Sequence, residues 1–422
     1  MARKKHLIIG AGTAALSALE KIRAVNSEDE VKLVTMEDCP PYSPASLPYL
    51  LSGRITEAKL WMEGEDYFKK LKSTLFKGRQ VSRVVPEKRQ VVYHDGTSEN
   101  YDFLLIAAGA ETAAPPVKGL AEVGALGFRT LADCRKLIQA LNGKKDVAIL
   151  GAGSIGMEVA SVLLGRGCHV TIIEKEPGIV PLCYNEEAEV YIRQTFVDRG
   201  AEFLTGKTAS EVKKKNGRVE IAFSDGKLLR TDILINAAGV RSRTSFLAGS
   251  GIKVNSGIVT DNRMRTSADR IYAAGDVAEP PDFFTQQQKV SAILPSAVNQ
   301  GKVAGGNMAG QNLEYEGGIP MTVFNFLGHK AFSLGMSLPC DQEGYQVIKQ
   351  TDDRSRKFKK LVFDGGRLVG AMYFNENIEP GVIVYLIKKR ADISAHKEAL
   401  FERTRPLTDP WLSSLKFSPA GR

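Results

Sequence analysis

The sequence predicts an α/β protein in which two parallel-sheet units follow one another and a smaller α+β domain ends the chain. Short apolar strands alternate with helical stretches, which is typical of a parallel sheet. A glycine-rich turn follows a strand twice, at residues 10–15 and 151–156. The segment Asp102-Phe-Leu-Leu-Ile-Ala-Ala-Gly109 is closely repeated as Asp232-Ile-Leu-Ile-Asn-Ala-Ala-Gly239. This internal duplication indicates two similar units in one chain.

The first unit begins with a short apolar strand and ends in a buried one. Its predicted elements are, in order, a strand at 6–9, a helix at 13–25, a strand at 31–36, a β-ribbon from 81 and a final strand at 103–107. Residues 40–53 contain several prolines and are therefore predicted to form no regular element.

The second unit repeats this order after a proline-rich crossing at residues 113–117. Its predicted elements are a strand at 147–150, a helix at 154–165, a strand at 170–174 and a β-ribbon over 210–230. Beyond residue 240 the chain reads as strand, turn and helix up to about residue 310. The remainder alternates short strands and ends with helices near 380–389 and 394–401, which predicts a separate α+β domain.

Composition and charge exclude several classes of protein. The chain has 422 residues, 43% hydrophobic and 25% charged, which excludes a disordered or collagen-like chain. The net charge of +9 would attract anionic nucleotides and acidic proteins. Nucleic acid is not expected as a partner, because the basic residues are scattered and no DNA- or RNA-binding motif occurs. The densest basic run, residues 354–360, is interpreted as a solvated hairpin edge, although it is compatible with an acidic partner.

The cysteines and histidines predict neither a disulfide framework nor a metal site. The five cysteines, which include Cys340, form no CxxC pair, and the five histidines form no cluster. This pattern fits a reducing, cytoplasmic location. No apolar stretch reaches the roughly 18 residues that a membrane helix needs, and no signal peptide is visible.

The first chemical motif is Gly10-Ala-Gly-Thr-Ala-Ala15. In such a turn the first glycine permits the tight bend, the second lets the backbone approach a pyrophosphate, and the small third position lets helix and strand pack closely. A strand precedes the motif and a helix follows it. Glu37 closes the next strand, where its carboxylate can accept the hydroxyl groups of an adenosine ribose. Gly10, Gly12, Ala15 and Glu37 therefore predict a dinucleotide site.

The second motif, Gly151-Ala-Gly-Ser-Ile-Gly156, is a complete G-x-G-x-x-G in the same setting. Gly151, Gly153 and Gly156 take the three glycine roles. Glu174 ends the following strand, where a carboxylate binds a ribose 2′-hydroxyl and repels a 2′-phosphate, so NAD is favoured over NADP.

The third motif is Ile271-Tyr-Ala-Ala-Gly-Asp276, a strand that ends in Gly-Asp. In third place after two glycine fingerprints, this turn resembles that of flavoproteins, and the resemblance implies that Asp276 would face the ribityl chain of a flavin. The next helix begins near residue 294 and contains Ala297. Its N-terminal N–H groups could stabilise the pyrimidine ring of the flavin, whose carbonyl gains charge on reduction.

These motifs, in this order and spacing, resemble the two-dinucleotide-binding-domain flavoproteins, the pyridine nucleotide-disulfide oxidoreductase class. The resemblance implies two Rossmann-like domains, with FAD on residues 1–114 and 240–320 and NAD on residues 115–239. It adds Val81, Gly109 and Gly239 to the cofactor-binding set. Residues 321–422 resemble, more loosely, the C-terminal interface domain of the NADH oxidase and coenzyme A-disulfide reductase branch.

One position departs from that family. Where its NADH oxidase and coenzyme A-disulfide reductase branch has a cysteine, this chain has Ala45, and Cys39 has no partner cysteine nearby. An alanine can neither relay electrons to a disulfide nor form a sulfenic acid. Disulfide reductase and peroxidase activities are therefore excluded as predictions, and hydride transfer between NADH and flavin remains.

The resemblance also implies roles for a few other residues. Glu158 matches a glutamate that lies near the nicotinamide in this family, with a helix residue packed at a domain interface as the alternative. Tyr42 would stack near the flavin or be structural. Phe324 and Phe326 would reach toward the flavin or form one face of a core strand.

The predicted function is an FAD-dependent NAD(H):acceptor oxidoreductase. Because the chain has no iron–sulfur motif, any cluster must be on a partner protein or subunit. The Ala45 variant looks like the NADH-linked flavoprotein subunits of 2-oxoacid oxidoreductase complexes of the phenylglyoxylate type, which would reduce NAD⁺. A free-standing rubredoxin, ferredoxin or quinone reductase is one alternative, and a nucleotide-regulated, flavin-bound interaction protein is another.

Overall fold

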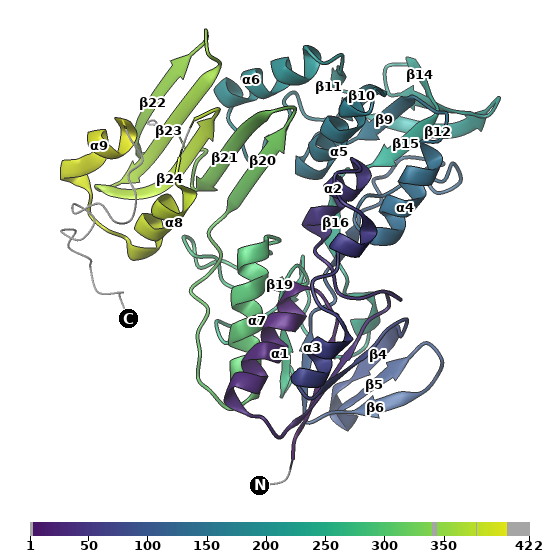
Figure 1. The fold of residues 1–422 in the computed structure, drawn as a ribbon, viewed down its shortest axis with the longest axis vertical. Coiled ribbons are helices and arrows are strands. Elements are labelled where there is room, and N and C mark those ends of the chain that lie inside the picture. The colour runs from purple at the N-terminus through teal and green to yellow at the C-terminus, as the bar shows by residue number, and fades with distance from the viewer. Residues whose placement is uncertain (1–2, 340–343, 377, 403–422) are drawn as a thin grey trace. The chain divides into compact units, whose positions relative to one another are not determined.

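A computed structural model describes residues 3–339, 344–376 and 378–402 (Figure 1). Cys340 lies outside these residues. The chain divides into two compact units, Met1–Ala113 with Val240–Ile319, and Ala114–Gly239 with Pro320–Arg422. In the described part of the chain, no helix has the length and apolar character needed to cross a membrane.

The first unit is built on a five-stranded parallel sheet in the order β18-β7-β1-β2-β3. These strands are Lys5–Ile9 (β1), Glu30–Val34 (β2), Ser73–Phe76 (β3), Phe103–Ile106 (β7) and Ile271–Ala273 (β18). The side chains of β1, β7 and β18 are almost all buried, as expected for parallel strands covered on both faces, whereas those of the edge strand β3 are not. Helices α1 (Thr13–Val25) and α7 (Leu294–Met308) lie side by side (Figure 1).

Smaller elements complete this unit. They are α3 (Glu65–Lys70), the antiparallel sheet of β4 (Val81–Val85), β5 (Gln90–Tyr93) and β6 (Ser98–Asn100), and the pairs β8 (Ala110–Thr112) with β16 (Val240–Ser242) and β17 (Ile258–Val259) with β19 (Ala278–Glu279).

The prediction that residues 40–53 form no regular element is wrong. They contain a 3-10 helix, η1 (Pro44–Ser46), and a short α-helix, α2 (Leu47–Leu51). Pro44 and Pro48 each stand in the first turn of their helix. The N–H group that proline lacks has no partner within a helix at that position, so the prolines begin these helices rather than break them.

The second unit contains a parallel sheet in the order β11-β10-β9-β15 and an antiparallel sheet in the order β12-β13-β14. The parallel strands are Asp146–Leu150 (β9), His169–Glu174 (β10), Glu202–Thr205 (β11) and Ile233–Asn236 (β15). The antiparallel strands are Ala209–Lys215 (β12), Arg218–Phe223 (β13) and Leu228–Thr231 (β14). The helices are α4 (Leu131–Ala140), α5 (Ser154–Gly165) and α6 (Glu186–Val197).

The C-terminal part of this unit is an antiparallel sheet in the order β20-β21-β24-β23-β22. Its elements are β20 (Met321–Phe326), β21 (His329–Gly335), β22 (Gln346–Asp352), β23 (Lys357–Asp364), β24 (Arg367–Phe374), α8 (Pro380–Lys389) and α9 (Lys397–Glu402). The mixed α/β architecture and the additional C-terminal α+β part confirm the predicted fold class.

The C-terminal sheet packs against α6 through aromatic rings. Phe196 of α6 stacks on Phe324 and Phe326, at 6.3 and 5.3 Å between ring centroids. Phe324 and Phe326 are 1% and 2% exposed, so they are core residues of β20, as one of the two interpretations predicted. Part of the basic run also faces α6, since Arg356 forms an ion pair with Asp198 at 2.5 Å. That run is therefore not solely a solvated edge.

Candidate functional site

The first glycine-rich loop joins β1 to α1 at the carboxyl end of the sheet. Gly10 has a φ of +117°, and a Cβ atom there would lie 2.2 Å from the carbonyl oxygen of Ala107. Gly12 is the N-cap of α1, and no side chain caps this helix end. The first N–H groups of α1 therefore point toward the loop, which fits the pyrophosphate of a dinucleotide. Ala15 is completely buried behind them.

Glu37 follows β2 beside this loop, as predicted. Its Oε2 accepts a hydrogen bond of 2.7 Å from the hydroxyl of Tyr42, which is only 7% exposed. The tyrosine thus holds the carboxylate that is predicted to bind the adenosine ribose. This contact gives Tyr42 a positioning role at the carboxylate.

The Gly275–Asp276 turn follows β18 and lies against the start of α1. Gly275 has a φ of +82°, and a Cβ atom there would lie 3.1 Å from the Cβ of Ala14. The carbonyl oxygen of Asp276 accepts a 2.9 Å hydrogen bond from Ser242. The predicted FAD elements at residues 10–15 and 275–276 are therefore close together in the structure.

Helix α7 supplies the remaining part of this region. A Cβ atom on Gly301 would lie 2.2 Å from the carbonyl oxygen of Ala14, so the backbones of α7 and α1 are in contact. No side chain caps the N-terminus of α7, and Ala297 in its first turns is 8% exposed. This uncapped end is suited to the partial negative charge of a flavin carbonyl.

Val81 and Gly109 belong to the same unit. Val81 begins β4 and is 7% exposed. Gly109 follows β7 with a φ of +68°, and its carbonyl oxygen accepts a 3.0 Å hydrogen bond from the backbone of Arg243.

The second glycine-rich loop joins β9 to α5. Gly151 has a φ of +102°, and a Cβ atom there would lie 2.4 Å from the carbonyl oxygen of Ala237. A Cβ atom on Gly156 would lie 2.1 Å from the carbonyl oxygen of Gly151. Gly153 is the N-cap of α5, which has no side-chain cap. The loop therefore fits a second pyrophosphate, for the same reason as the first.

Glu174 is fixed to this loop by backbone hydrogen bonds. Its Oε2 accepts a hydrogen bond of 2.7 Å from the N–H of Ala152, and its Oε1 accepts one of 3.0 Å from the N–H of Glu176. The carboxylate stands beside the glycine turn, as a ribose-binding acid must. Gly239, with a φ of +125°, lies just past β15, whose neighbouring residue Ala237 contacts Gly151.

Glu158 is partly buried on α5. Burial raises the pKa of its carboxyl group to about 7. On a helix, residues three and four apart share a face, so Glu158 lies on the same side as Ser154 and Ser161. Ser161 accepts a 3.3 Å hydrogen bond from Leu327, just past β20. The thiol of Cys183 lies 3.8 Å from Ser154 and 3.3 Å from Thr322 of β20. The face that carries Glu158 therefore meets β20.

Ala45, at the position of the family's cysteine, is exposed in η1. The described cysteines are the thiols Cys39, Cys134, Cys168 and Cys183. Among the described residues, no group of His, Cys, Asp and Glu could hold a metal ion.

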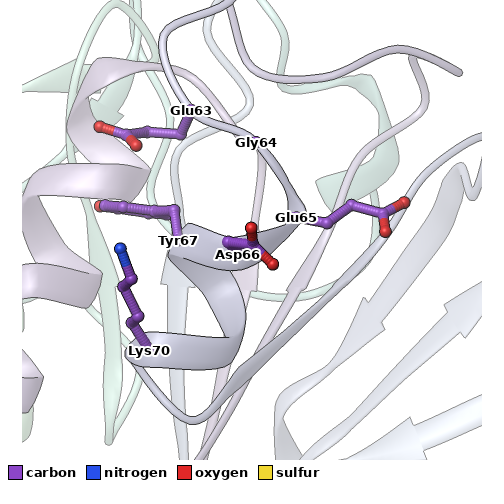
Figure 2. Close-up of a pocket in the computed structure, with 6 residues that line it drawn as sticks. All are labelled: Glu63, Gly64, Glu65, Asp66, Tyr67 and Lys70. Carbon is purple, nitrogen blue, oxygen red and sulfur yellow. The ribbon is translucent and has the colours of Figure 1, made fainter.

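A surface hollow of about 460 Å³ lies elsewhere in the first unit. It is lined by Glu63, Gly64, Glu65, Asp66, Tyr67 and Lys70 (Figure 2). The side chains of Glu63, Tyr67 and Lys70 point to the same side (Figure 2). The hydroxyl of Tyr67 donates a hydrogen bond of 3.0 Å to Glu20. The predicted site residues are not among those that line it.

Sequence reasoning missed the residues that support the predicted ones. Ser242 and Gln300 hold the backbone of the Gly275–Asp276 turn. Both are distant from the turn in sequence and follow no periodic pattern. The one local signal is the run of small residues in the helix at 294–308, which indicates that the backbone of another element comes close.

Two family profiles match the chain. The pyridine nucleotide-disulphide oxidoreductase family matches residues 4–301, and the rubredoxin NAD⁺ reductase C-terminal domain matches residues 320–391. These matches confirm the resemblance that the motifs predicted.

Two relatives and one solved structure agree with the profiles. The chain is 33% identical to the NADH-dependent phenylglyoxylate dehydrogenase subunit epsilon of Aromatoleum evansii, over 92% of this chain and 93% of the relative. It is 31% identical to a rubredoxin-NAD(+) reductase of Alcanivorax borkumensis, over 75% and 82%. A crystal structure of a ferredoxin reductase from Rhodopseudomonas palustris superposes with a TM-score of 0.81 at 25% identity, covering 88% of this chain and 91% of that one.

The family binds FAD and NAD(H), and its related members are NADH-dependent flavoprotein oxidoreductases. The two uncapped helix ends, each preceded by a glycine turn and flanked by a carboxylate, fit those two cofactors. The chain belongs to the pyridine nucleotide-disulphide oxidoreductase family and is an NAD(H)-dependent flavoprotein oxidoreductase.

Proposed function

We propose that this flavoprotein passes electrons between NAD(H), FAD and an iron–sulfur protein or subunit. We infer further that it does so as the flavoprotein subunit of a 2-oxoacid oxidoreductase complex of the phenylglyoxylate type, in which NAD⁺ is reduced. FAD, when bound, exchanges a hydride with the nicotinamide and can exchange single electrons with a cluster.

The observation that carries the proposal is Ala45. The family's disulfide and peroxide chemistry needs a thiol at this position, and the exposed alanine in η1 offers none. An electron acceptor or donor that requires no thiol, such as an iron–sulfur cluster, is consistent with this substitution. The phenylglyoxylate dehydrogenase subunit supports the finer assignment, because the similarity spans nearly the full length of both chains.

The proposed cofactor residues follow the two loops. FAD would occupy the domain formed by residues 1–114 and 240–320, with Gly10, Gly12, Ala15, Glu37, Val81, Gly109, Asp276 and Ala297 as its contacts. NAD(H) would occupy residues 115–239, with Gly151, Gly153, Gly156, Glu174 and Gly239 as its contacts. Residues 321–422 would form an interface domain.

The chain's own residues bind and orient the reactants rather than exchange protons with them. Helix N-termini at both loops hold the anionic phosphates, and Glu37 and Glu174 hold the riboses. Glu158 is the candidate residue near the nicotinamide. Burial raises the pKa of its carboxyl group to about 7, so its charge changes near neutral pH.

A second candidate is a free-standing rubredoxin or ferredoxin reductase. The match of residues 320–391 to the rubredoxin NAD⁺ reductase C-terminal domain favours it. The family assignment favours both enzymatic proposals over a non-catalytic interaction protein.

The test is anaerobic stopped-flow spectroscopy of the native, co-purified protein mixed with NADH. Flavin and iron–sulfur absorbance are followed together. Flavin bleaching followed by reduction of co-purified clusters is expected for a subunit of a complex. Bleaching without a cluster signal, in a protein that purifies alone, would support the free-standing reductase instead.

The thiol-free chemistry has its own test in Cys39→Ser. We expect this variant to keep its FAD and to turn over NADH at the wild-type rate. Loss of steady-state turnover with FAD still bound would contradict the proposed mechanism.

A further inference from the structure

Gln300 is a completely buried amide on α7. Its Oε1 accepts a 2.8 Å hydrogen bond from the N–H of Gly275, and its Nε2 faces the hydroxyl of Tyr315 at 3.4 Å. Gly275 adopts the left-handed conformation, so its N–H points in a direction that ordinary strand pairing would not satisfy. Without Gln300, that buried N–H would lose its partner.

The hydrogen bonds continue from Gln300 to the first turn of α7. Tyr315, only 6% exposed, also bonds to the side chain of Ser296, and burial raises the pKa of the tyrosine. Ser296 lies 2.9 Å from the hydroxyl of Ser291. One buried polar chain therefore joins the Gly275 turn to the N-terminal turn of the helix.

The same place is the junction with α1. Ala14 of the first glycine loop contacts both Gly275 and Gly301, the residue after Gln300. A Cβ atom on Gly301 would lie 2.2 Å from the backbone of Ala14, so α7 cannot approach further. Three segments from distant parts of the sequence thus meet around Gly275 and the Gln300–Gly301 pair.

We propose that Gln300 is a positioning residue for the flavin. By holding the Gly275 N–H, it fixes the turn that presents Asp276, and through Tyr315 and Ser296 it fixes the helix turn that contains Ala297. This rests on the proposed assignment of Asp276 and Ala297 to FAD. The consequence is that Gln300 sets both the affinity for FAD and the reduction potential of bound FAD, without touching the cofactor.

Gln300→Met removes the amide while keeping the size of the side chain. The matched control is Asn307→Leu, on the same helix. Asn307 is a buried amide that donates 2.9 Å hydrogen bonds to the carbonyl oxygens of Arg263 and Leu313 and accepts one of 2.7 Å from Leu313. Both substitutions remove buried amide–backbone bonds, but only the first lies at the turn.

The measurements are the dissociation constant of FAD, from fluorescence titration of the apoprotein, and the midpoint potential of the reconstituted flavin. We expect Gln300→Met to weaken FAD binding about tenfold, because it leaves the buried Gly275 N–H without a partner, and to shift the potential. Asn307→Leu should lower the melting temperature with neither effect. Gln300→Glu, which keeps an oxygen for the Gly275 N–H, should recover most of the affinity.

The proposal is overturned if Gln300→Met binds FAD as the wild type does with an unchanged potential, or if Asn307→Leu has the same effects. If Gln300→Met does not fold, Tyr315→Phe removes only the far end of the chain. The proposal is supported if Tyr315→Phe shifts the flavin potential from the wild-type value in the same direction as Gln300→Glu does, but by less. It is overturned if neither variant shifts the potential. Asp276→Ala separates a failure of the Gln300 proposal from a failure of the FAD site assignment. Unchanged FAD affinity in that variant would reject the site assignment itself.

Discussion

The two dinucleotide units solve the same packing problem with glycines at different places. In the second unit, Gly156 lets the start of α5 lie against the loop, because a Cβ atom there would be 2.1 Å from the Gly151 carbonyl oxygen. In the first unit the equivalent position is Ala15, and its methyl group is accommodated. The close approach occurs instead between α1 and α7, at Gly301 and Gly305.

The carboxylates at or just past the end of the second strand of each unit are also held by different contacts. Glu37 is held by the side chain of Tyr42, whereas Glu174 is held by the backbone of the glycine loop itself. A shared fingerprint therefore leaves the supporting contacts free to differ. These contacts therefore predict that a substitution tolerated in one unit will be harmful at the equivalent position of the other.

The largest expected effect is that of Gly156→Ala. The clash with the Gly151 carbonyl oxygen should cost about 2–3 kcal/mol at the loop, or about 30- to 150-fold in NADH affinity, with FAD content unchanged. Gly165→Ala is the matched control, because it lies on the same helix with open space around it. The measurement is the NADH concentration dependence of flavin reduction in stopped flow.

Ala15→Gly completes the comparison in the first unit. We expect it to retain FAD and to lose about 0.5–1 kcal/mol of stability, the usual cost of glycine in a helix. If Gly156→Ala binds NADH normally, or Ala15→Gly loses its FAD, the contrast between the two third positions is wrong.

Local patterns predicted most elements and both loops, because the information lies within a few residues. The helix at 154–165 and the core face of Phe324 and Phe326 follow from periodicity alone. The packing of Phe196 on β20 and the bond from Gln300 to Gly275 join residues that are distant in sequence. Such contacts depend on how whole elements meet, which no local period encodes.

The prediction for residues 40–53 failed for a related reason, because it missed the short helices at residues 44–51. Proline was interpreted as a breaker, although at the first turn it starts a helix. The sequence therefore locates the candidate cofactor residues better than it locates the residues that hold them.

Gly301→Ala should have the next largest effect, and in the other unit. Its Cβ atom would meet the Ala14 carbonyl oxygen and push α7 from α1, at a cost of about 1–3 kcal/mol. We expect faster release of FAD, measured as flavin fluorescence after dilution, with NADH affinity of the remaining holoprotein unchanged. Gly64→Ala, in the same unit with open space around it, is the control. Equal FAD release from both variants would contradict this.

Glu158→Gln tests a position at which the two units differ in chemistry. The equivalent residue on α1 is Ser17, whereas Glu158 is a partly buried carboxyl group on the face of α5 that meets β20. Because its pKa is raised in the folded state, the unfolded chain loses this proton first as the pH rises. Stability should therefore fall between about pH 4.5 and 7 and then level off.

Glutamine mimics the protonated form, so Glu158→Gln should be more stable than the wild type at pH 8, by of the order of 2 kcal/mol, and equal to it below pH 4.5. Chemical denaturation across this pH range gives the answer, with the exposed Glu186→Gln as control. A changed rate of flavin reduction by NADH would support a place near the nicotinamide. A stability effect alone would favour a packed interface residue.

The smallest effect expected on cofactor affinity is that of Tyr42→Phe. The hydroxyl holds Glu37 at 2.7 Å, so its loss frees the carboxylate without removing it. Such a bond contributes about 1 kcal/mol, which corresponds to roughly fivefold in FAD affinity. Glu37→Gln, which removes the charge itself, should cost more. In the NAD unit the corresponding hold on Glu174 comes from backbone N–H groups, so no single side-chain deletion there should reproduce the effect. FAD titration of the two apoprotein variants ranks them, and a larger loss from Tyr42→Phe than from Glu37→Gln would show that the tyrosine contacts FAD directly.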